Sequence, residues 1–431
     1  MATQVSVKAK VTGAFTYYST YAAARSAASS GDVITIWADL NEQIILKDGV
    51  DINIISGRIL DMTSAMPTII DNGVKCICNI FGEGIIKNSY SGTTKYECVK
   101  LTNSQSQVYM ECDYLEASGN TSSLSRSVAT ILISNASKFN LICNNIYNHR
   151  DSAIIITICE NLYIKCKTIE SGISGETNIG TSVINSKGSG YIFSDDVICN
   201  GFGSCIEQTG GNLFANILKL TTKNNATAAK PTVLLDNVSG NQNLNLIFDE
   251  IQNLNTIDGD TVTLAEGKAT LKGRRIYSEK GLSLDLAANA NIICSEIVSL
   301  TQGVNITNTN PEKIIIDADL IEGSTGNSGV IYSLAASNFT IRNAKIKNTS
   351  TSSYSVGVYL NASNASPYVE LKNVIIVTGN IASGETIQVL IGANAVNIYN
   401  YGLFLNKDFT DADVLIGTVN NYKLITDVLV T

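Results

Sequence analysis

The sequence has few of the residues from which most catalytic and metal sites are built. Its 431 residues include one histidine, one tryptophan, four prolines and four methionines, and only 16% of the residues are charged. The single histidine, His149, excludes a zinc site with several imidazole ligands, and we expect it in a surface loop. No run of 18 apolar residues occurs, so we expect no membrane-spanning helix.

The chain also lacks a concentration of positive charge. Its net charge is −8 and its pI is about 4.9. Without a stripe of lysines and arginines, we expect no nucleic-acid partner. The first residues, MATQVSVK, lack the apolar core of a signal peptide. We therefore expect a protein that is made in the cytoplasm and is not exported.

What the chain has in abundance is one phrase of eight residues, apolar-x-apolar-x-apolar-x-x-apolar. A clear copy consists of Val108, Met110, Cys112 and Leu115. Other copies close at Ile59, Ile146, Ile169, Val197, Leu220, Ile251, Ile276, Ile297, Leu320, Ile346, Ile376 and Leu403. The copies recur about every 26 residues, and a fixed period of roughly 20–50 residues is typical of stacked repeats.

The spacing within the phrase predicts the fold of each repeat. Three alternating apolar positions indicate a strand with one buried face, and the two-residue gap before the fourth position shifts the phase, so the chain must turn a corner. Helical repeats would place apolar residues three or four apart. We therefore predict an all-β fold, a parallel β-helix (β-solenoid) of roughly 13–14 coils in which each coil pairs with the next.

Ten cysteines are present, and none has the Cys-x-x-Cys spacing of metal and redox sites. Four of them occupy the third apolar position of the phrase: Cys112, Cys143, Cys166 and Cys294. We expect these side chains to point inward as reduced thiols, with Cys143 and Cys166 one coil apart. The sequence indicates neither a metal site nor a cofactor.

The two ends of the chain differ from the repeats. Residues 1–18 form an arm that either adds a strand or attaches the protein to a partner. Residues 19–403 form the β-helix and begin with an Ala-rich capping helix over residues 19–29, because the open strand edge of a stacked-repeat protein must be covered. Residues 404–431 form a strand cap with a turn at Val419–Asn421, which closes its own chain or exchanges strands within a trimer.

The segment AAARSAASSGDVITIWADLNEQIILKDGVDINIISG, within residues 19–60, resembles the opening of the pectin-lyase-like right-handed parallel β-helix proteins. Those proteins begin with an Ala-rich helix, a Gly-Asp turn and a Gly-Val-x-Ile-x-Gly strand, so the resemblance implies a right-handed coil. Their scaffold serves lyases, hydrolases, bacterial adhesins and phage tailspikes, and it specifies a fold rather than one function. The Asn-, Ile- and Tyr-rich composition is most similar to bacteriophage fibres and tailspikes.

The two residues before the closing position face outward at the corner. Along the chain these pairs are Asp195-Asp196, Leu218-Lys219, Asp249-Glu250, Arg274-Arg275, Ser295-Glu296, Ala318-Asp319 and Ala344-Lys345. Opposite charges one coil apart attract, so we predict a charge ladder that fixes the register. Glu296 and Asp319 break the alternation. On neighbouring coils their carboxylates would lie about 5 Å apart, a spacing that suits glycoside hydrolysis by two carboxylates.

Asp195 and Asp196 are a second candidate for catalysis. The run Ser194-Asp195-Asp196, followed by Gly-Phe-Gly, resembles the paired-aspartate motif of polygalacturonases, which implies a hydrolase. The Gly-His-Gly and Arg-Ile-Lys motifs of those enzymes do not occur in this sequence. Exposed tyrosines offer platforms for sugar binding, and the candidates are Tyr17, Tyr18, Tyr90, Tyr354 and Tyr359.

Together these features predict a structural and adhesive bacteriophage virion protein, made in the host cytoplasm. It would be a fibre, spike or capsid-decorating rod that presents its corner loops to the host surface. We expect a homo-oligomer, a trimer, in contact with other virion proteins and with a host cell-surface glycan. Two alternatives stay open. One is a tailspike that degrades polysaccharides as a hydrolase or lyase, and the other is a bacterial surface adhesin.

Overall fold

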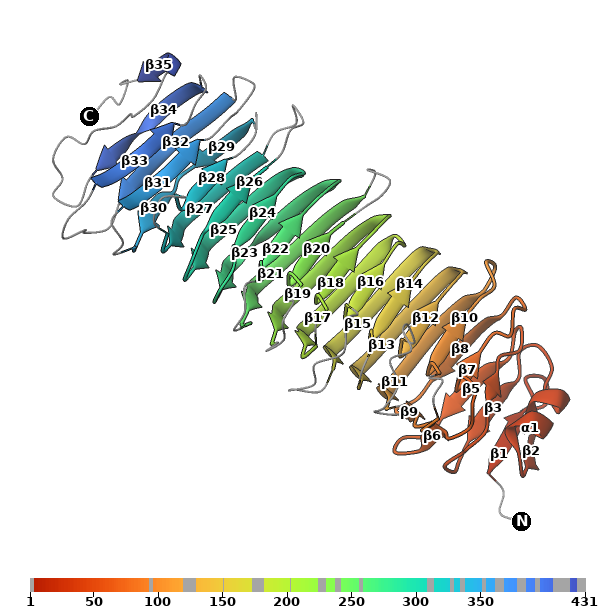
Figure 1. Ribbon diagram of the computed structural model, residues 1–431. Helices are drawn as coiled ribbons and strands as arrows, with labels where there is room; N and C mark the ends of the chain where they lie inside the picture. Colours follow the sequence, from red (N-terminus) through yellow and green to blue (C-terminus); the bar gives the residue numbers. More distant parts are fainter. Residues whose placement is uncertain are drawn as a thin grey trace. The chain divides into compact units, whose positions relative to one another are not determined.

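The computed structural model describes residues 4–92, 96–118, 129–149, 151–172, 182–201, 203–223, 230–236, 242–255, 259–307, 314–325, 329–333, 338–350, 354–360, 368–377, 385–391, 396–405 and 419–424. The chain forms two compact units, Met1–Ile217 and Leu218–Thr431. In both units the described regular structure is parallel β-strand, apart from one short α-helix and one antiparallel hairpin (Figure 1). The predicted all-β fold with parallel coils is confirmed. No described helix is long and apolar enough to cross a membrane.

The first unit contains the helix α1 (Tyr21–Ala27). Its strands are β1 (Val5–Lys8), β2 (Phe15–Tyr18), β3 (Val33–Ile36), β4 (Ile44–Ile45), β5 (Asp51–Ile54), β6 (Ile59–Met62), β7 (Ile69–Ile70), β8 (Ile77–Phe81), β9 (Ile85–Asn88), β10 (Val99–Leu101), β11 (Gln107–Ala117), β12 (Ile131–Ile133), β13 (Ala136–Asn148), β14 (Ile154–Ile156), β15 (Cys159–Ser171), β16 (Ile184–Ser186), β17 (Gly190–Cys199), β18 (Ile206–Gln208) and β19 (Asn212–Thr222), the last of which runs on into the second unit.

The strands of the second unit are β20 (Val233–Leu235), β21 (Asn243–Asn253), β22 (Val262–Leu264), β23 (Lys268–Ser278), β24 (Leu284–Leu286), β25 (Asn289–Ser299), β26 (Val304–Ile306), β27 (Ile314–Gly323), β28 (Ile331–Ser333), β29 (Phe339–Arg342), β30 (Lys345–Asn348), β31 (Tyr354–Leu360), β32 (Tyr368–Val377), β33 (Glu385–Ile391), β34 (Val396–Leu405) and β35 (Val419–Leu424).

A typical coil has one long strand and one short strand. Long strands pair in parallel with the long strands of neighbouring coils, as β11 does with β13 and β21 with β23. Short strands stack in the same way, as β10, β12 and β14 do. The described residues contain seven short strands in each unit, namely β4, β7, β10, β12, β14, β16 and β18, then β20, β22, β24, β26, β28, β31 and β33. The expected number of coils is confirmed.

The long strands bend where the sequence predicts a corner. In β11, Cys112 is buried, Asp113 and Tyr114 are half-buried, and Leu115 is buried again. Two successive outward residues shift the alternation by one place, so the apolar side chains point into the same interior on both sides of the bend. The interior is therefore a column of apolar side chains, one layer for each coil.

Three predicted closing residues are wrong by one place. In each case two apolar residues stand side by side, and the spacing alone does not distinguish them: the pairs are Ile59-Leu60, Leu320-Ile321 and Leu403-Phe404. The register selects the second residue each time, through the pairings Leu60↔Ile86, Ile321↔Ile346 and Ile376↔Phe404. Where burial is described it agrees, because Leu60 and Ile321 are fully buried.

The predicted capping helix is confirmed. α1 begins after Thr20, whose hydroxyl accepts a hydrogen bond from Ala23 N at 3.2 Å. The Tyr21 side chain is buried, and its hydroxyl donates to Ile45 O at 3.0 Å. The helix is thereby tied to β4, in the first layer of the coil.

Within the predicted arm, residues 4–18 form a hairpin beside this helix (Figure 1). β1 pairs antiparallel with β2 on one side and with β3 on the other, so the expected added strand is confirmed. At the other end of the chain, the predicted turn at Val419–Asn421 is wrong. These residues begin β35, which pairs in parallel with β34 and so gives its backbone groups partners in the existing stack. The segments 414–416 and 428–430 of the predicted cap lie outside the described residues.

Candidate functional site

A ladder of alternating charges follows the corner of the long strands in the second unit. Glu250 of β21 is level with Arg275 of β23, which is level with Glu296 of β25. Arg275 Nη1 lies 3.3 Å from Glu250 Oε1, and Arg275 Nε lies 3.4 Å from Glu296 Oε2. Lys219 Nζ lies 3.7 Å from Glu250 Oε2. The predicted charge ladder is confirmed for these four side chains.

A second ion pair lies beside the ladder. Arg274 donates from Nε to Asp249 Oδ1 at 2.8 Å and from Nη2 to Asp249 Oδ2 at 3.1 Å. These bonds lower the pKa of Asp249 and raise the pKa of Arg274. Both side chains are about half exposed. Because water screens such a pair, it contributes little to stability and both charged groups stay accessible.

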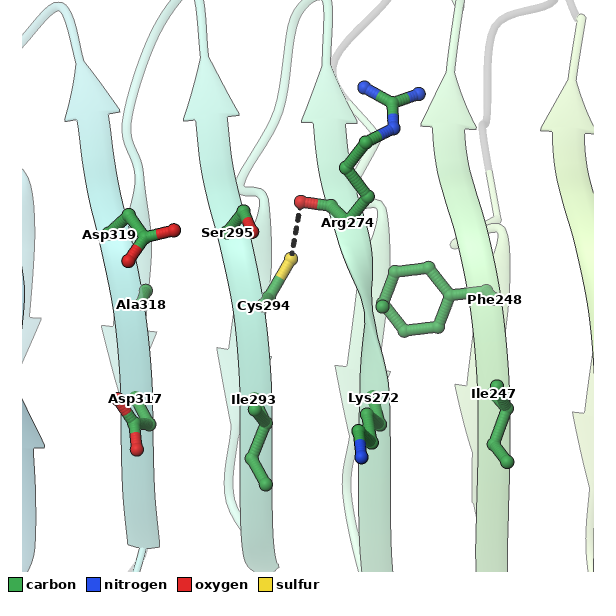
Figure 2. A pocket seen from close by; sticks show the side chains of 11 residues that line it. Ile247, Phe248, Lys272, Arg274, Ile293, Cys294, Ser295, Asp317, Ala318 and Asp319 are labelled. Carbon is green, nitrogen blue, oxygen red and sulfur yellow. Dashed lines mark hydrogen bonds between the residues drawn. The ribbon is translucent and has the colours of Figure 1, made fainter.

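A shallow groove of about 440 Å³ lies at this corner (Figure 2). Lys272 and Arg274 of β23 form one wall, and Asp317 and Asp319 of β27 form the other. β25 runs between them and contributes Ser295 to the lining. The groove therefore has a cationic wall and an anionic wall, separated by two coil spacings of about 4.8 Å each.

Contrary to the expectation from the sequence, Glu296 and Asp319 are not level with each other on neighbouring coils. Glu296 is level with Leu320, so the residue level with Asp319 is Ser295, as Figure 2 shows. The error follows from taking Leu320 as the closing residue. Because Ile321 takes that position instead, Asp319 lies one place away from the column that holds Glu296.

Asp195 and Asp196 lie at the corner of β17 in the first unit. Asp195 is exposed and Asp196 is half-buried. Asp196 is level with Thr168 of β15, a neutral residue, so that coil brings no further carboxylate to the pair. In the Gly-Phe-Gly segment that follows, the two glycines are buried and Phe202 lies outside the described residues. A catalytic role for these aspartates stays a hypothesis.

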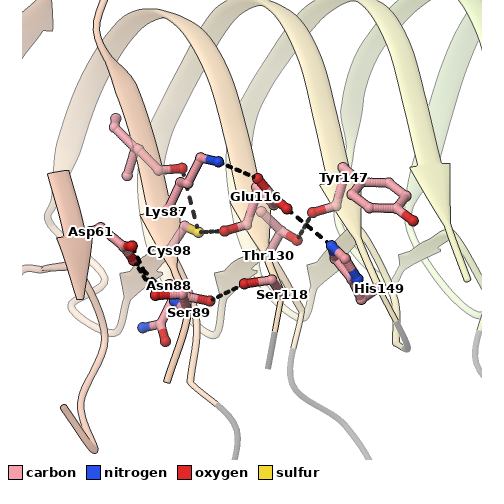
Figure 3. Close-up of polar contacts among 11 residues, drawn as sticks. Asp61, Lys87, Asn88, Ser89, Cys98, Glu116, Ser118, Thr130, Tyr147 and His149 are labelled. Atoms are coloured by element: carbon pink, nitrogen blue, oxygen red, sulfur yellow. Dashed lines mark hydrogen bonds and ion pairs between the residues drawn. The ribbon is translucent and has the colours of Figure 1, made fainter. Parts of the chain in front are cut away.

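His149 belongs to a network of charged side chains in the first unit (Figure 3). Its Nε2 lies 2.9 Å from Glu116 Oε1, and Lys87 Nζ lies 2.8 Å from Glu116 Oε2. These contacts, with the hydrogen bond to His149 the larger cause, lower the pKa of Glu116 from 4.5 to about 2. His149 directly follows β13, in keeping with the expected loop, but its ring is held by Glu116.

A patch of aromatic side chains lies on the outward face of β15, β17 and β19 in the first unit. The aromatic patch consists of Tyr163, Tyr191, Phe193 and Phe214. Ring centroids are 5.5 Å apart for Tyr163 and Phe193, 5.7 Å for Tyr191 and Phe214, and 6.2 Å for Phe193 and Phe214. Tyr191 is 54% exposed and the other three side chains are half-buried. Three neighbouring coils thus present a continuous aromatic surface.

The tyrosines expected to bind sugars are more scattered. Tyr17 is 60% exposed, whereas Tyr18, Tyr90 and Tyr359 are half-buried. The side chain of Tyr354 lies outside the described residues. None of these five tyrosines belongs to the aromatic patch. The side chains of the patch are far apart in the sequence and become neighbours only because the coils stack.

The cysteines line the interior as predicted. All ten are buried and free. Cys112, Cys143 and Cys166 are level with one another on successive coils, and Cys143 Sγ donates to Cys166 Sγ at 3.5 Å. Burial raises the pKa of the Cys294 thiol to about 12, which keeps it protonated and unreactive.

Compared with protein-family models, with curated proteins and with solved structures, the chain has no match. Its function must therefore be inferred from its own geometry. Across the part of the chain that the structure describes, no three His, Cys, Asp or Glu side chains are grouped as metal ligands. The features with functional potential are the groove, with its walls of opposite charge, and the aromatic patch.

Proposed function

We propose that this protein is a structural and adhesive component of a bacteriophage particle, and that it binds a host cell-surface glycan through the aromatic patch. The patch is the observation that carries the proposal. Aromatic rings combine a large apolar face with polar groups at the edge, and a sugar ring offers an apolar face of C–H groups with hydroxyls around it. The half-exposed ring of Tyr191 supplies such a face beside three further rings.

The size of the patch also favours a small ligand unit over a protein surface. A stable protein interface buries about 800 Å² on each partner, whereas a fully buried aromatic side chain contributes roughly 150–250 Å². Three of the four rings are already half-buried in this chain, so the patch exposes much less than a protein interface requires. The Asn-, Ile- and Tyr-rich composition, which is most similar to bacteriophage fibres and tailspikes, supports the setting on a phage particle.

The charges around the groove support binding rather than cleavage. Glycoside hydrolysis requires a carboxylic acid with a raised pKa and a second carboxylate. Asp317 accepts hydrogen bonds from Arg342 Nε at 2.8 Å and from Asn343 Nδ2 at 2.9 Å, so both of its carboxylate oxygens already have partners within the chain. The polysaccharide-degrading alternative keeps one favourable observation, because Asp317 and Asp319 are two places apart on the groove side of one strand.

Binding to immobilised bacterial capsular and O-antigen polysaccharides tests the proposal. We expect the double variant Tyr191→Ala/Phe193→Ala to bind about tenfold more weakly than the unaltered protein, since a loss of about 1.4 kcal/mol corresponds to tenfold. Tyr332→Ala/Tyr359→Ala is the matched comparison, because these two rings are also tilted against each other, at 5.2 Å, in the second unit, and Tyr359 is one of the tyrosines that the sequence offered for sugar binding.

Equal binding by both double variants would contradict the role of the patch. Shortened oligosaccharides that appear with the unaltered protein and disappear with Asp319→Asn would establish the degrading alternative. Mass spectrometry of purified phage particles tests whether the protein is a component of the particle. Detection of this polypeptide would support the proposal, and its absence would contradict it.

A further inference from the structure

The N-terminal hairpin ends in a strand with one open edge. β2 pairs with β1 through Val5↔Tyr18, Ser6↔Tyr17, Val7↔Thr16 and Lys8↔Phe15, and no other described strand pairs with it. Phe15 and Tyr17 are 48% and 60% exposed, and Thr16 is exposed as well. Within the described residues, no strand therefore pairs with β2 on its far side.

The hydrogen-bond pattern shows which groups the open edge presents. Ala9 N donates to Ala14 O at 3.0 Å, and bonded pairs alternate along an antiparallel ladder. Two places further on, Val7 and Thr16 are the next bonded pair, so the N–H and C=O of Thr16 point toward β1. The N–H and C=O groups of Phe15 and Tyr17 then point away from β1, toward the open side.

This edge has none of the features by which soluble proteins protect an edge strand. Such edges usually carry a charged side chain, a proline or a bulge. The sequence of β2 is Phe-Thr-Tyr-Tyr, which has neither charge nor proline and consists of residues that favour strands. Phe15 and Tyr17 stack at 6.5 Å on one face of the strand. An edge of this kind is a template for pairing with another strand.

We propose that β2 pairs antiparallel with β2 of a second copy of this chain, around a two-fold axis at Thr16. In this register Phe15 lies opposite the partner's Tyr17, and Tyr17 lies opposite the partner's Phe15. Each of these pairs exchanges two backbone hydrogen bonds, because the open N–H and C=O groups of both strands face each other. The inference is independent of the proposed glycan binding.

A second copy fits this edge because the edge is complementary to itself. The two-fold places an aromatic residue opposite an aromatic residue twice on one face, and such cross-strand pairs each contribute about 0.2–1 kcal/mol. No charged side chain stands on β2, so the pairing brings no like charges together. Closed two-fold dimers are also the commonest homo-oligomers. The interface favours a dimer, where the sequence alone led us to expect a trimer.

The pairing of two short strands buries less surface than a standard interface, which buries about 800 Å² on each partner. We therefore expect a dimer that dissociates on dilution. Light scattering coupled to size-exclusion chromatography, over a concentration series, measures the mass. A mass that stays at one chain across the series would overturn the inference.

Thr16→Cys tests the register. At the axis the two Thr16 residues form a non-hydrogen-bonded pair with Cα atoms about 4.5 Å apart, which lies within disulfide range. We expect oxidation of this variant to give a covalent dimer on a non-reducing gel, since the ten native thiols are buried. Thr12→Cys, in the exposed turn of the same hairpin, is the control and should remain monomeric.

Tyr17→Pro separates pairing from folding. The substitution removes an N–H that points to the open side and leaves the bonds to β1 in place, so we expect a folded monomer with unchanged circular dichroism. Tyr17→Phe keeps the N–H and the ring and should stay dimeric. An oligomer that persists in Tyr17→Pro, or that does not cross-link through Thr16→Cys, would show that another surface joins the chains.

Discussion

The two units hold the same corner in register by different chemistry. In the first unit the corner carries neutral and charged residues side by side, and Asn144 Nδ2 donates to Asp113 Oδ1 on the preceding coil at 2.7 Å. In the second unit the position of Asn144 is taken by Arg274, which pairs with Asp249, and the next position by Arg275, which lies between Glu250 and Glu296. An amide bonds to almost any polar neighbour, whereas a charged column works only if the sign alternates from coil to coil. The charged corner therefore specifies its register more strictly.

The inward position before the corner shows a second contrast. In the first unit the same residue type fills this position on three successive coils, namely Cys112, Cys143 and Cys166. In the second unit the position is filled by Phe248 on one coil and Gly273 on the next. A Cβ on Gly273 would lie 2.4 Å from the Phe248 ring, so the large side chain occupies the space that the glycine leaves. The layers of the interior can vary in size when neighbouring layers compensate.

The largest expected effect tests this compensation. Phe248→Ala removes a buried ring next to a glycine that cannot fill the gap, and we expect it to cost about 3–5 kcal/mol of unfolding free energy. Gly273→Ala should also be destabilising, because its Cβ would lie 2.4 Å from the Phe248 ring and 2.5 Å from Phe248 O; beside Phe248→Ala only the clash with the ring is removed. Urea unfolding followed by circular dichroism measures both changes.

Cys143→Ala in the uniform column is the control for that experiment. It deletes one sulfur atom from a stack of equal residues, and we expect a cost of about 1 kcal/mol. If Gly273→Ala cost as much free energy beside Phe248→Ala as it does alone, the ring and the glycine would be independent and the compensation between layers would be refuted.

An intermediate effect sharpens the contrast between the corners. Glu250→Gln keeps the shape of the side chain but leaves Arg275 and Lys219 without their shared carboxylate, and we expect a loss of about 1–3 kcal/mol. Asp249→Asn breaks the exposed pair with Arg274 and should cost less, because water screens that pair. Urea midpoints at low and high salt compare the two variants. An equal cost for both would remove the distinction between the ladder of Glu250 and Arg275 and the exposed pair of Asp249 and Arg274.

Much of this fold could be predicted from the sequence, because the repeated phrase records the strand period and the corner directly. The bend after Cys112 follows from two consecutive outward residues. The register near Asp319 could not be predicted in the same way, since Leu320 and Ile321 are equally apolar and only packing distinguishes them. The expectation that Glu296 and Asp319 are level was therefore wrong, although the ladder through Arg275 was found.

The aromatic patch was missed for a related reason. Tyr163 and Tyr191 are level on neighbouring coils, but the copy that contains Tyr191 opens with Gly190, which is level with the buried Leu162. Because a glycine stands where other copies have an apolar residue, the start of this copy cannot be recognised from the pattern. The alignment of Tyr163 with Tyr191 was therefore not predicted. Alignment of the coils by their closing residues, Ile169 and Val197, would have brought the two rings together.

The smallest expected effect concerns acid stability in the first unit, where an isolated charge cluster replaces the ladder. The pKa of Glu116 is lowered to about 2 by His149 and Lys87, against 4.5 in the unfolded chain. The stabilisation from this carboxylate is therefore complete above pH 4.5, declines as the pH falls below it, and is lost below about pH 2.

Glu116→Gln removes the titrating group, so we expect its urea midpoint to depend less on pH over this interval than the midpoint of the unaltered protein. Tyr147→Phe leaves both partners of Glu116 in place and should keep the original slope. If Glu116→Gln retained the full pH dependence, the carboxylate would not be held by its partners in solution. In that case the first unit would rely at this position, as it does between Asn144 and Asp113, on hydrogen bonds rather than on ion pairs.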